Sequence, residues 1–171
     1  FEAELGYVHK GTEKLFETLP LEKTLTLAEH ISGDSSVHHA LALAQAVETL
    51  TETTIPTRAK LIRMVVAELE RLANHFNDIG FIMLDTGFSF GGSHGARIRE
   101  RIMQWNDRLS GNRFSRGMIA FGGVSRDIEE SLGDALQADL EELEMDFKEM
   151  IDIALDSDSL LNRLKGTGRL D

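Results

Sequence analysis

The longest regular pattern in the chain is an apolar stripe between residues 57 and 86. Its members follow one another at steps of three or four positions: Leu61, Val65, Leu69, Leu72, Phe76, Ile79 and Met83. This spacing matches the 3.6-residue period of an α-helix and places the side chains on one face. Ile62, Val66 and Ala73 widen that face. The sequence therefore predicts one long helix over Thr57–Thr86, buried on much of its surface.

Shorter segments with the same period predict further helices on both sides. The expected ranges are about 12–17, 21–31, 36–52, 94–110, 127–156 and 157–165. Strand-like alternation is scarce, so helix-on-helix packing is the only layer arrangement that this pattern supports. We expect a mainly α multi-helix bundle with little or no β structure. We also expect residues 1–171 to form a single helical domain, with the acidic helices of 127–165 packed on the core.

Residues that favour helix starts stand before three of these segments. Asp34 or Ser35 is the expected N-cap of the 36–52 helix, because either side chain can accept a hydrogen bond from the free amides of the first turn. Ser93 is the expected cap of the 94–110 helix. Asp127, with Glu130 three residues later, resembles a capping box.

Glycines mark the expected loops. Gly87, Gly91 and Gly92 should release the chain from the long helix into a loop. Gly111 is placed to end the next helix in a left-handed turn. Residues 113–124 are expected to form a loop with a short extended piece.

Composition excludes several classes of protein. The 171 residues are 42% hydrophobic, which is enough for the core of one domain. Cysteine is absent, so this chain alone can build no disulfide, cysteinyl zinc site or iron–sulfur cluster. The net charge of −11 argues against nucleic acid as a ligand. There is no transmembrane-length apolar run and no basic-then-apolar leader. Because the first residue is Phe1, we expect an excised or processed piece of a longer chain.

The charge is unevenly distributed along the chain. Residues 127–158 hold 13 acidic residues and one basic residue, whereas 97–126 hold seven arginines and two acidic residues. Three interpretations remain open. The two segments are two halves of an internal ion-pair arrangement, or both are solvated faces, or the arginine-rich segment faces an anionic partner.

A few polar residues are candidates for chemistry. Asp85 ends an otherwise apolar stripe, and burial of a carboxyl group raises its pKa and suits it to proton handling. The alternative is that Asp85 bonds the amides of the adjacent glycine loop. Glu13 is a first-turn glutamate that favours the helix dipole. The histidines lack the HExxH spacing of a zinc helix, and neither glycine pair has the spacing of a phosphate loop.

The ordered set of motifs resembles a known family. GYVHKGTEKLFE (Gly6–Glu17) resembles the GYLHRGxEKL signature of nickel–iron hydrogenase large subunits of the energy-converting type, and of the related hydrogenase-like D subunit of NADH:quinone oxidoreductase (complex I). The other pieces follow in the family's order: HALALAQAVETL, IPTRAKLIRMVVAELERLANH, LDTG, RIRERI, LSGNRF and GGVSRD. ISGDSSVHHALALAQAVE is most similar to the formate hydrogenlyase and hydrogenase-4 branch. The resemblance implies the helical core of that fold.

The resemblance also exposes a lost metal site. The family's hydrogenases carry a CGxCxxxH motif whose two thiolates bind the nickel–iron centre. Counted back from Ala46, its positions fall on Ser32, Gly33, Ser35 and His39. A serine hydroxyl is a hard ligand and cannot replace a soft bridging thiolate. The family's second cysteine pair would lie beyond Asp171. We therefore expect no metal in this chain and no hydrogenase activity.

Two carboxylates of the family pattern are intact. The glutamate implicated in hydrogenase proton transfer falls on Glu13, and the aspartate that partners the quinone-pairing histidine of complex I falls on Asp85. That histidine would lie before Phe1, and the family's quinone-binding tyrosine falls on Gly33. The resemblance implies that Glu13 and Asp85 are catalytic and face a cavity shared with an iron–sulfur small subunit.

The resemblance implies a place in a membrane-bound redox complex. The chain would lie on its cytoplasmic arm, peripheral to the inner face of the plasma membrane, beside the iron–sulfur subunit and other subunits. This piece itself would bind no cofactor. Quinone would bind in the full complex, and the iron–sulfur cluster would belong to the partner subunit. NAD binding is implied only by the family's membership of NADH-oxidising complexes.

Two other classes of function stay open. One is a non-catalytic docking or scaffold subunit that has lost the nickel–iron site. The other is a standalone metal enzyme that uses His38, His39 and nearby acidic residues.

Overall fold

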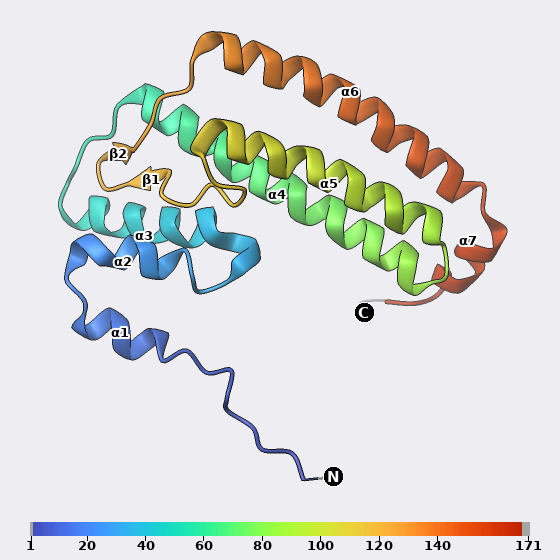
Figure 1. Cartoon of the computed structure of the whole chain (residues 1–171), viewed down its shortest axis with the longest axis horizontal. Helices are drawn as coiled ribbons and strands as arrows, with labels where there is room; N and C mark the ends of the chain where they lie inside the picture. The colour runs from blue at the N-terminus through green and yellow to red at the C-terminus, as the bar shows by residue number, and fades with distance from the viewer. Residues whose placement is uncertain (1, 169–171) are drawn as a thin grey trace.

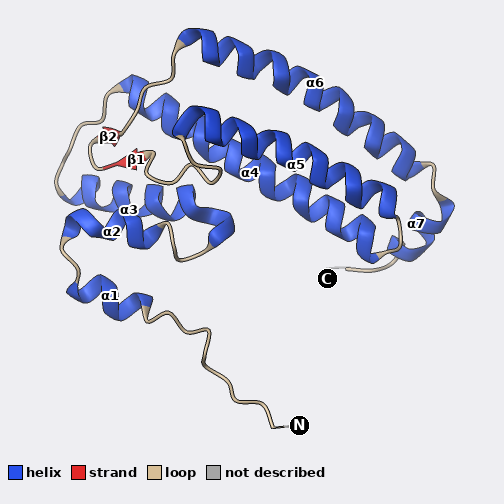
Figure 2. Cartoon of the chain, in the orientation of Figure 1, coloured by secondary structure: helices blue, strands red, loops and turns tan. Residues whose placement is uncertain are grey.

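The computed structural model describes residues 2–168, and its regular structure is almost entirely helical (Figure 1, Figure 2). The elements are α1 (Thr12–Thr18), α2 (Leu21–Ala28), a 3-10 turn (Gly33–Ser35), α3 (Ser36–Leu50), α4 (Thr57–Asp85), α5 (Ser89–Ser110), β1 (Ile119–Ala120), β2 (Gly123–Val124), α6 (Glu130–Leu155) and α7 (Asp158–Leu164). The predicted mainly α class is confirmed, and the predicted long helix differs from α4 by one residue.

The α4–α5 hairpin forms the centre of the molecule (Figure 1). The two helices approach closely where Gly80 faces Gly95. A Cβ atom on Gly95 would lie only 2.7 Å from the carbonyl oxygen of Phe76 and 2.8 Å from the Cα of Gly80. Glycine at this crossing therefore lets two backbones touch.

The expected loop at residues 87–92 is largely wrong. The chain turns at Gly87, which has a positive φ of 84°, and α5 begins at Ser89. Gly91 and Gly92 lie inside α5, where they pack against α4. Ser93 also lies within the helix and does not cap it. Glycine here serves close helix packing, which a single sequence does not distinguish from chain breaking.

Helix α6 runs along the hairpin on the side of α5 (Figure 1). Its buried residues Leu136, Leu143, Met150 and Ala154 are spaced by seven, seven and four positions and so share one face. Helix α7 then packs its Leu160 beneath the end of the hairpin.

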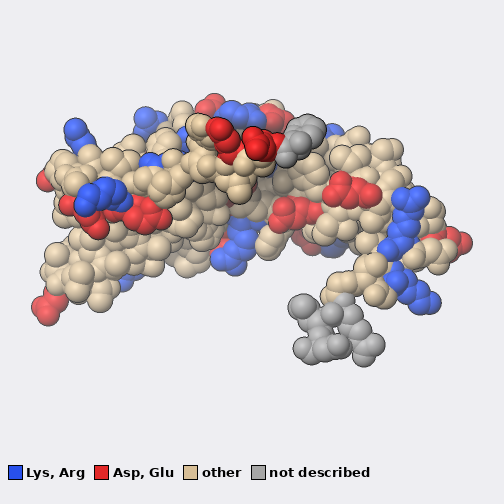
Figure 3. Space-filling view, turned by 90° about the horizontal axis from the view of Figure 1, so that it is seen from below, with Lys and Arg blue, Asp and Glu red and all other residues tan. Residues whose placement is uncertain are grey.

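Ion pairs join the arginine-rich segment to the acidic helix. Arg97 Nη1 lies 3.0 Å from Asp146 Oδ2, and Arg101 donates to Asp139. The indole Nε1 of Trp105 donates to the second oxygen of Asp139 at 2.6 Å. The interpretation as two halves of an internal ion-pair arrangement is therefore confirmed for these residues. Basic and acidic groups are interspersed on the face that Figure 3 shows.

A small antiparallel hairpin lies against α3 and α4. Its strands pair Ile119 with Val124 and Ala120 with Gly123, which confirms the short extended piece expected in 113–124. Arg63 of α4 reaches this hairpin and donates to the carbonyl oxygens of Gly123 and Ala120 at 2.9 and 2.7 Å. The hairpin is thereby fixed to the helical core.

One predicted helix end is confirmed and one capping box is wrong. Gly111 follows α5 with φ 78°, in the left-handed region as expected. Helix α6 begins at Glu130, with Glu129 at the N-cap position. Asp127 lies outside the helix and accepts hydrogen bonds from the amide of Ile128 and the guanidinium of Arg58, both at 2.8 Å. The Asp127 carboxylate, which the sequence pattern predicted to cap α6, is therefore bonded to Arg58 of α4 instead.

Candidate functional site

The positions of the nickel–iron motif form the connection between α2 and α3. Ser32 precedes the 3-10 turn, Ser35 is the last residue of that turn, and His39 follows in the first turn of α3; all three are half-buried. Asn74 of α4 holds the turn by donating its Nδ2 hydrogen to the carbonyl oxygen of Asp34 at 2.6 Å. The structure therefore brings the three predicted positions together and fixes them against the central helix.

Glu70 of α4 caps the start of α3. Its carboxylate accepts from the backbone amides of Val37, at 2.7 Å, and His38, at 3.0 Å. The Nδ1 atom of His38 lies 2.5 Å from the same carboxylate. A carboxylate at a helix N-terminus satisfies free amides and interacts favourably with the helix dipole. Ser35 occupies the N-cap position, as one of the two predicted residues, but its side chain makes no cap bond, and the Glu70 carboxylate takes that role.

Glu70 belongs to none of the candidate motifs, but its position in the sequence carries a signal. Val66, Glu70 and Ala73 follow one another at steps of four and three, so Glu70 lies on the buried face of α4. Only 7% of Glu70 is exposed. A charged group on an apolar helix face needs polar partners, and such a residue is a candidate for a cap or a site.

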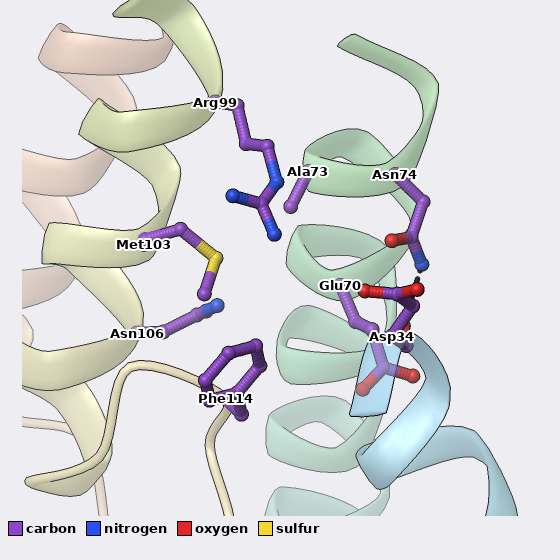
Figure 4. Close-up of a pocket in the computed structure, with 8 residues that line it drawn as sticks. All are labelled: Asp34, Glu70, Ala73, Asn74, Arg99, Met103, Asn106 and Phe114. Carbon is purple, nitrogen blue, oxygen red and sulfur yellow. Dashed lines mark hydrogen bonds between the residues drawn. The ribbon is translucent and has the colours of Figure 1, made fainter. Parts of the chain in front are cut away.

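A small cavity with both polar and apolar lining adjoins the turn (Figure 4). It is lined by Asp34, Glu70, Ala73, Asn74, Arg99, Met103, Asn106 and Phe114. Figure 4 shows Arg99, Met103 and Asn106 extending from α5 into the space that faces α4. In the sequence, Arg99 is one of seven arginines of the basic segment, and no motif marks Asn106. Polar groups from α4, α5 and the turn thus meet beside the lost metal motif.

Glu13 lies in a separate, more open hollow near the N-terminal end of the described chain. The hollow has a volume of about 470 Å³ and is lined by Val8, His9, Lys10, Thr12, Glu13, Phe16 and Ile31. Lys10 fixes it by donating to the carbonyl oxygens of His30 and Ile31, at 2.9 and 3.0 Å. Glu13 itself is exposed in α1. The structure therefore places Glu13 within a hollow that ends at Ile31, one residue before Ser32.

Asp85 is not brought to this turn. It is the last residue of α4 and is exposed, so the expectation of a buried carboxylate is wrong for the described part of the chain. Asn74, which touches the turn, lies eleven residues earlier on the same helix. At 1.5 Å per residue, this separation is roughly 16 Å along the helix axis. The stripe ends before Asp85 because the chain reaches the tip of the hairpin.

The residues at the motif positions do not fit a nickel–iron centre. Ser32 and Ser35 supply hydroxyl oxygens where soft thiolates are needed. Within residues 2–168, no three His, Asp or Glu side chains gather closely enough to hold a metal ion. The Nδ1 atom of His38, a ligand in the metal-enzyme alternative, is paired with Glu70 instead.

A second buried carboxylate lies behind the turn. Glu29, at the end of α2, is 4% exposed, and its Oε1 accepts from the amide of Gly117 at 2.6 Å. Burial raises the pKa of Glu29, while the Gly117 amide and the nearby His30 and Arg116 oppose that rise. No motif or periodic pattern in the sequence marks Glu29 as buried.

The chain is similar to proteins of several redox complexes. It is 32% identical over 170 residues to formate hydrogenlyase subunit 5 of Escherichia coli (strain K12), covering 98% of this chain and 30% of that protein. It is 30% identical over 169 residues to the D subunit of NADH-quinone oxidoreductase from Desulfitobacterium hafniense (strain Y51), covering 99% of this chain and 46% of that protein.

A solved structure shares the same arrangement of helices. One chain of the membrane-bound sulfane sulfur reductase (MBS), an archaeal respiratory membrane complex, superposes with a TM-score of 0.89 at 27% identity. The match covers 97% of this chain and 45% of that one. The chain thus spans less than half the length of each of these relatives.

The family itself is shown by the second half of the sequence. Residues 85–171 match the family described as the respiratory-chain NADH dehydrogenase 49 kDa subunit. The described helices offer none that is both long and apolar enough to cross a membrane. Because the match extends over half of the chain and agrees with the relatives along nearly all of it, this protein belongs to the respiratory-chain NADH dehydrogenase 49 kDa subunit family.

Proposed function

We propose that this chain forms the helical core of a hydrogenase-like large subunit in a membrane-associated redox complex. The complex is of the NADH:quinone oxidoreductase or formate hydrogenlyase type, and residues 1–171 act in it as one helical unit. The observation that carries the proposal is the turn at Ser32–Ser35. Asn74 of α4 bonds this turn, and Lys10 of the first motif bonds the carbonyl oxygens of His30 and Ile31 just before it, although the two cysteine positions are serines.

Glu13 is the proposed proton-transfer residue. It stands in a hollow that ends at Ile31, next to the turn in sequence, and its exposure in the described chain leaves it open to a partner subunit or to water. A carboxylate positioned beside a redox site can accept and release protons as electrons arrive. The hollow, with His9 and Lys10 also in its wall, would form one side of the cavity shared with the iron–sulfur small subunit.

Asp85 is proposed to act at a second place, the tip of the α4–α5 hairpin. Its distance from the turn means that it does not share the Glu13 hollow within the described residues. In the complete complex, it would pair with a group that another segment or subunit brings to this tip.

The cofactors in this proposal belong to the complete complex. Quinone would bind in the shared cavity, and the iron–sulfur cluster would belong to the small subunit. The protein would lie at the cytoplasmic face of the membrane, held there by its partners. No step is assigned to nickel or iron in this chain, because hydroxyl oxygens replace the thiolates.

The second candidate function is a non-catalytic scaffold. Its support is the same serine-substituted turn, which Asn74 and Glu70 of α4 hold in place through hydrogen bonds. A scaffold would keep the partner contacts and would not need Glu13.

Substitution of Glu13 separates the two functions. In the native complex, Glu13→Gln should lower quinone-reducing turnover by about 100-fold, because a general acid–base contributes at least that much. Glu17→Gln is the matched control on the same helix, since Glu17 is exposed and pairs with Lys14 on the surface. Unchanged turnover in Glu13→Gln, with the complex intact, would contradict the proton role of Glu13, whereas an intact unsubstituted complex without quinone turnover would support the scaffold.

A further inference from the structure

Two buried polar atoms beside the turn lack a hydrogen-bond partner among the described residues. They are Nε of Arg99, which is a donor, and Oδ1 of Asn106, which is an acceptor; each exposes less than 1 Å². The amide of Asn106 is oriented by its Nδ2, which donates to the carbonyl oxygen of Arg113 at 3.1 Å. Asn106 as a whole is only 2% exposed, so bulk water does not reach its oxygen.

Both side chains line the cavity in Figure 4. The cavity offers about 10 Å³ to the centre of a water-sized sphere. One bound water needs roughly 10–15 Å³ by that measure, and it also needs two to four polar partners. The size therefore excludes a phosphate, a carboxylic acid or any larger ligand, and it fits one water molecule.

We propose that this cavity is a binding site for a single structural water. The water accepts a hydrogen bond from Arg99 Nε and donates one to Asn106 Oδ1. The remaining lining of the cavity includes Glu70 of α4 and Asp34 of the turn. One molecule thus satisfies a buried donor and a buried acceptor, as buried waters in proteins do.

The water would connect α5 to the elements that hold the turn. Arg99 and Asn106 belong to α5, whereas Glu70 belongs to α4 and caps α3 through Val37 and His38. The site therefore provides a link, through one water molecule, between the α5 side of the cavity and the lining that Glu70 of α4 and Asp34 of the turn contribute. The link does not depend on the redox function proposed above, because it stands on the fold of this chain alone.

Nuclear magnetic resonance of the whole 171-residue chain tests the site. The Hε resonance of Arg99, assigned by its loss in Arg99→Lys, should show a cross-peak to water with the sign of a long-lived complex. Asn106→Leu should remove this cross-peak, because the variant keeps a similar volume and deletes the acceptor. Ala73→Val should also remove it, because Ala73 lines the cavity and the added methyl groups fill it.

Ala96→Val is the matched control, since Ala96 is exposed on α5 and should leave the cross-peak unchanged. The proposal would be overturned if the Arg99 Hε of the unsubstituted chain showed no bound water. It would equally be overturned if the cross-peak persisted in Ala73→Val, with the variant folded by circular dichroism. The first of these results needs no variant beyond the assignment, so a failure of Ala73→Val or Asn106→Leu to fold does not remove the test.

Discussion

Arg63 of α4 and Glu48 of α3 form a two-point ion pair inside the protein. Arg63 Nη1 lies 2.9 Å from Glu48 Oε2, and Nη2 lies 2.5 Å from Oε1, with 5% and 7% of the two side chains exposed. The hydrogen bonds from Arg63 hold the pKa of the Glu48 carboxyl below its usual value. Glu48 also accepts from the amide of Gly122 at 2.8 Å, so the pair joins two helices and the β1–β2 hairpin.

Removal of one member of this pair should be costly. Arg63→Met should lower the free energy of unfolding by about 3–5 kcal/mol, because it leaves a buried carboxylate without its partner. Urea unfolding followed by circular dichroism measures the change. Arg71→Met is the control: Arg71 pairs with Glu68 on the surface, and an exposed pair contributes only about 0–1 kcal/mol. Equal losses of unfolding free energy in the two variants would contradict the stabilising role of the buried Arg63–Glu48 pair.

The cap of α3 by Glu70 predicts a second loss of stability. Glu70→Ala should destabilise the chain by about 1–3 kcal/mol, because it leaves the amides of Val37 and His38 without their acceptor. Amide hydrogen exchange at those two positions should accelerate more than exchange in the middle of α3. The exposed Glu68→Ala should leave both rates unchanged, and slow exchange in Glu70→Ala would contradict the capping role.

The close helix crossing predicts an unequal pair of glycine substitutions. Gly95→Ala should destabilise the α4–α5 hairpin, by about 1–3 kcal/mol, because the new Cβ would overlap the backbone at Phe76 and Gly80. Gly133→Ala, in α6, meets nothing within 4 Å and should stabilise by about 0.5–1 kcal/mol through its helix propensity. Thermal unfolding of both variants measures the difference. Equal effects would mean that the two helices do not touch at Gly95.

The buried Glu29 predicts a pH dependence. Its pKa is raised above 4.5 by burial, so the folded chain binds the proton more tightly than the unfolded chain does. Stability from this group is therefore greatest below pH 4.5 and is lost as the pH rises through the folded pKa. Glu29→Gln, which can still accept from Gly117, should flatten the fall in unfolding free energy over that range. If the unfolding free energy of the unsubstituted chain and of Glu29→Gln changed equally with pH, the raised pKa of Glu29 would be contradicted.

Much of the fold could be predicted from local sequence pattern. The stripe from Leu61 to Met83 defined α4, and Gly111 ended α5 where its left-handed φ was expected. These features depend on the period of one helix or on one residue's conformational freedom. The α5–α6 ion pairs could also be proposed from charge alone, because opposite charges occupied adjacent segments.

The features that were missed depend on contacts between distant segments. Glu70 caps a helix that starts 34 residues before it in the sequence, and Arg58 donates a hydrogen bond to Asp127, which lies 69 residues further along the chain. Gly91 and Gly92 looked like chain breakers because a single sequence does not show the helix that packs on them. The family resemblance located the Ser32–Ser35 turn, but the exposure of Asp85 and the Arg99–Asn106 cavity required the packed structure.

Purification of the intact native assembly tests the central claim most directly. An affinity tag on the native protein, followed by mass spectrometry, electron paramagnetic resonance and metal analysis, would report its partners and metals together. The account predicts stoichiometric recovery of an iron–sulfur subunit and membrane subunits, with iron–sulfur signals and no nickel. Recovery of the protein without these partners, or with one nickel per chain, would contradict it.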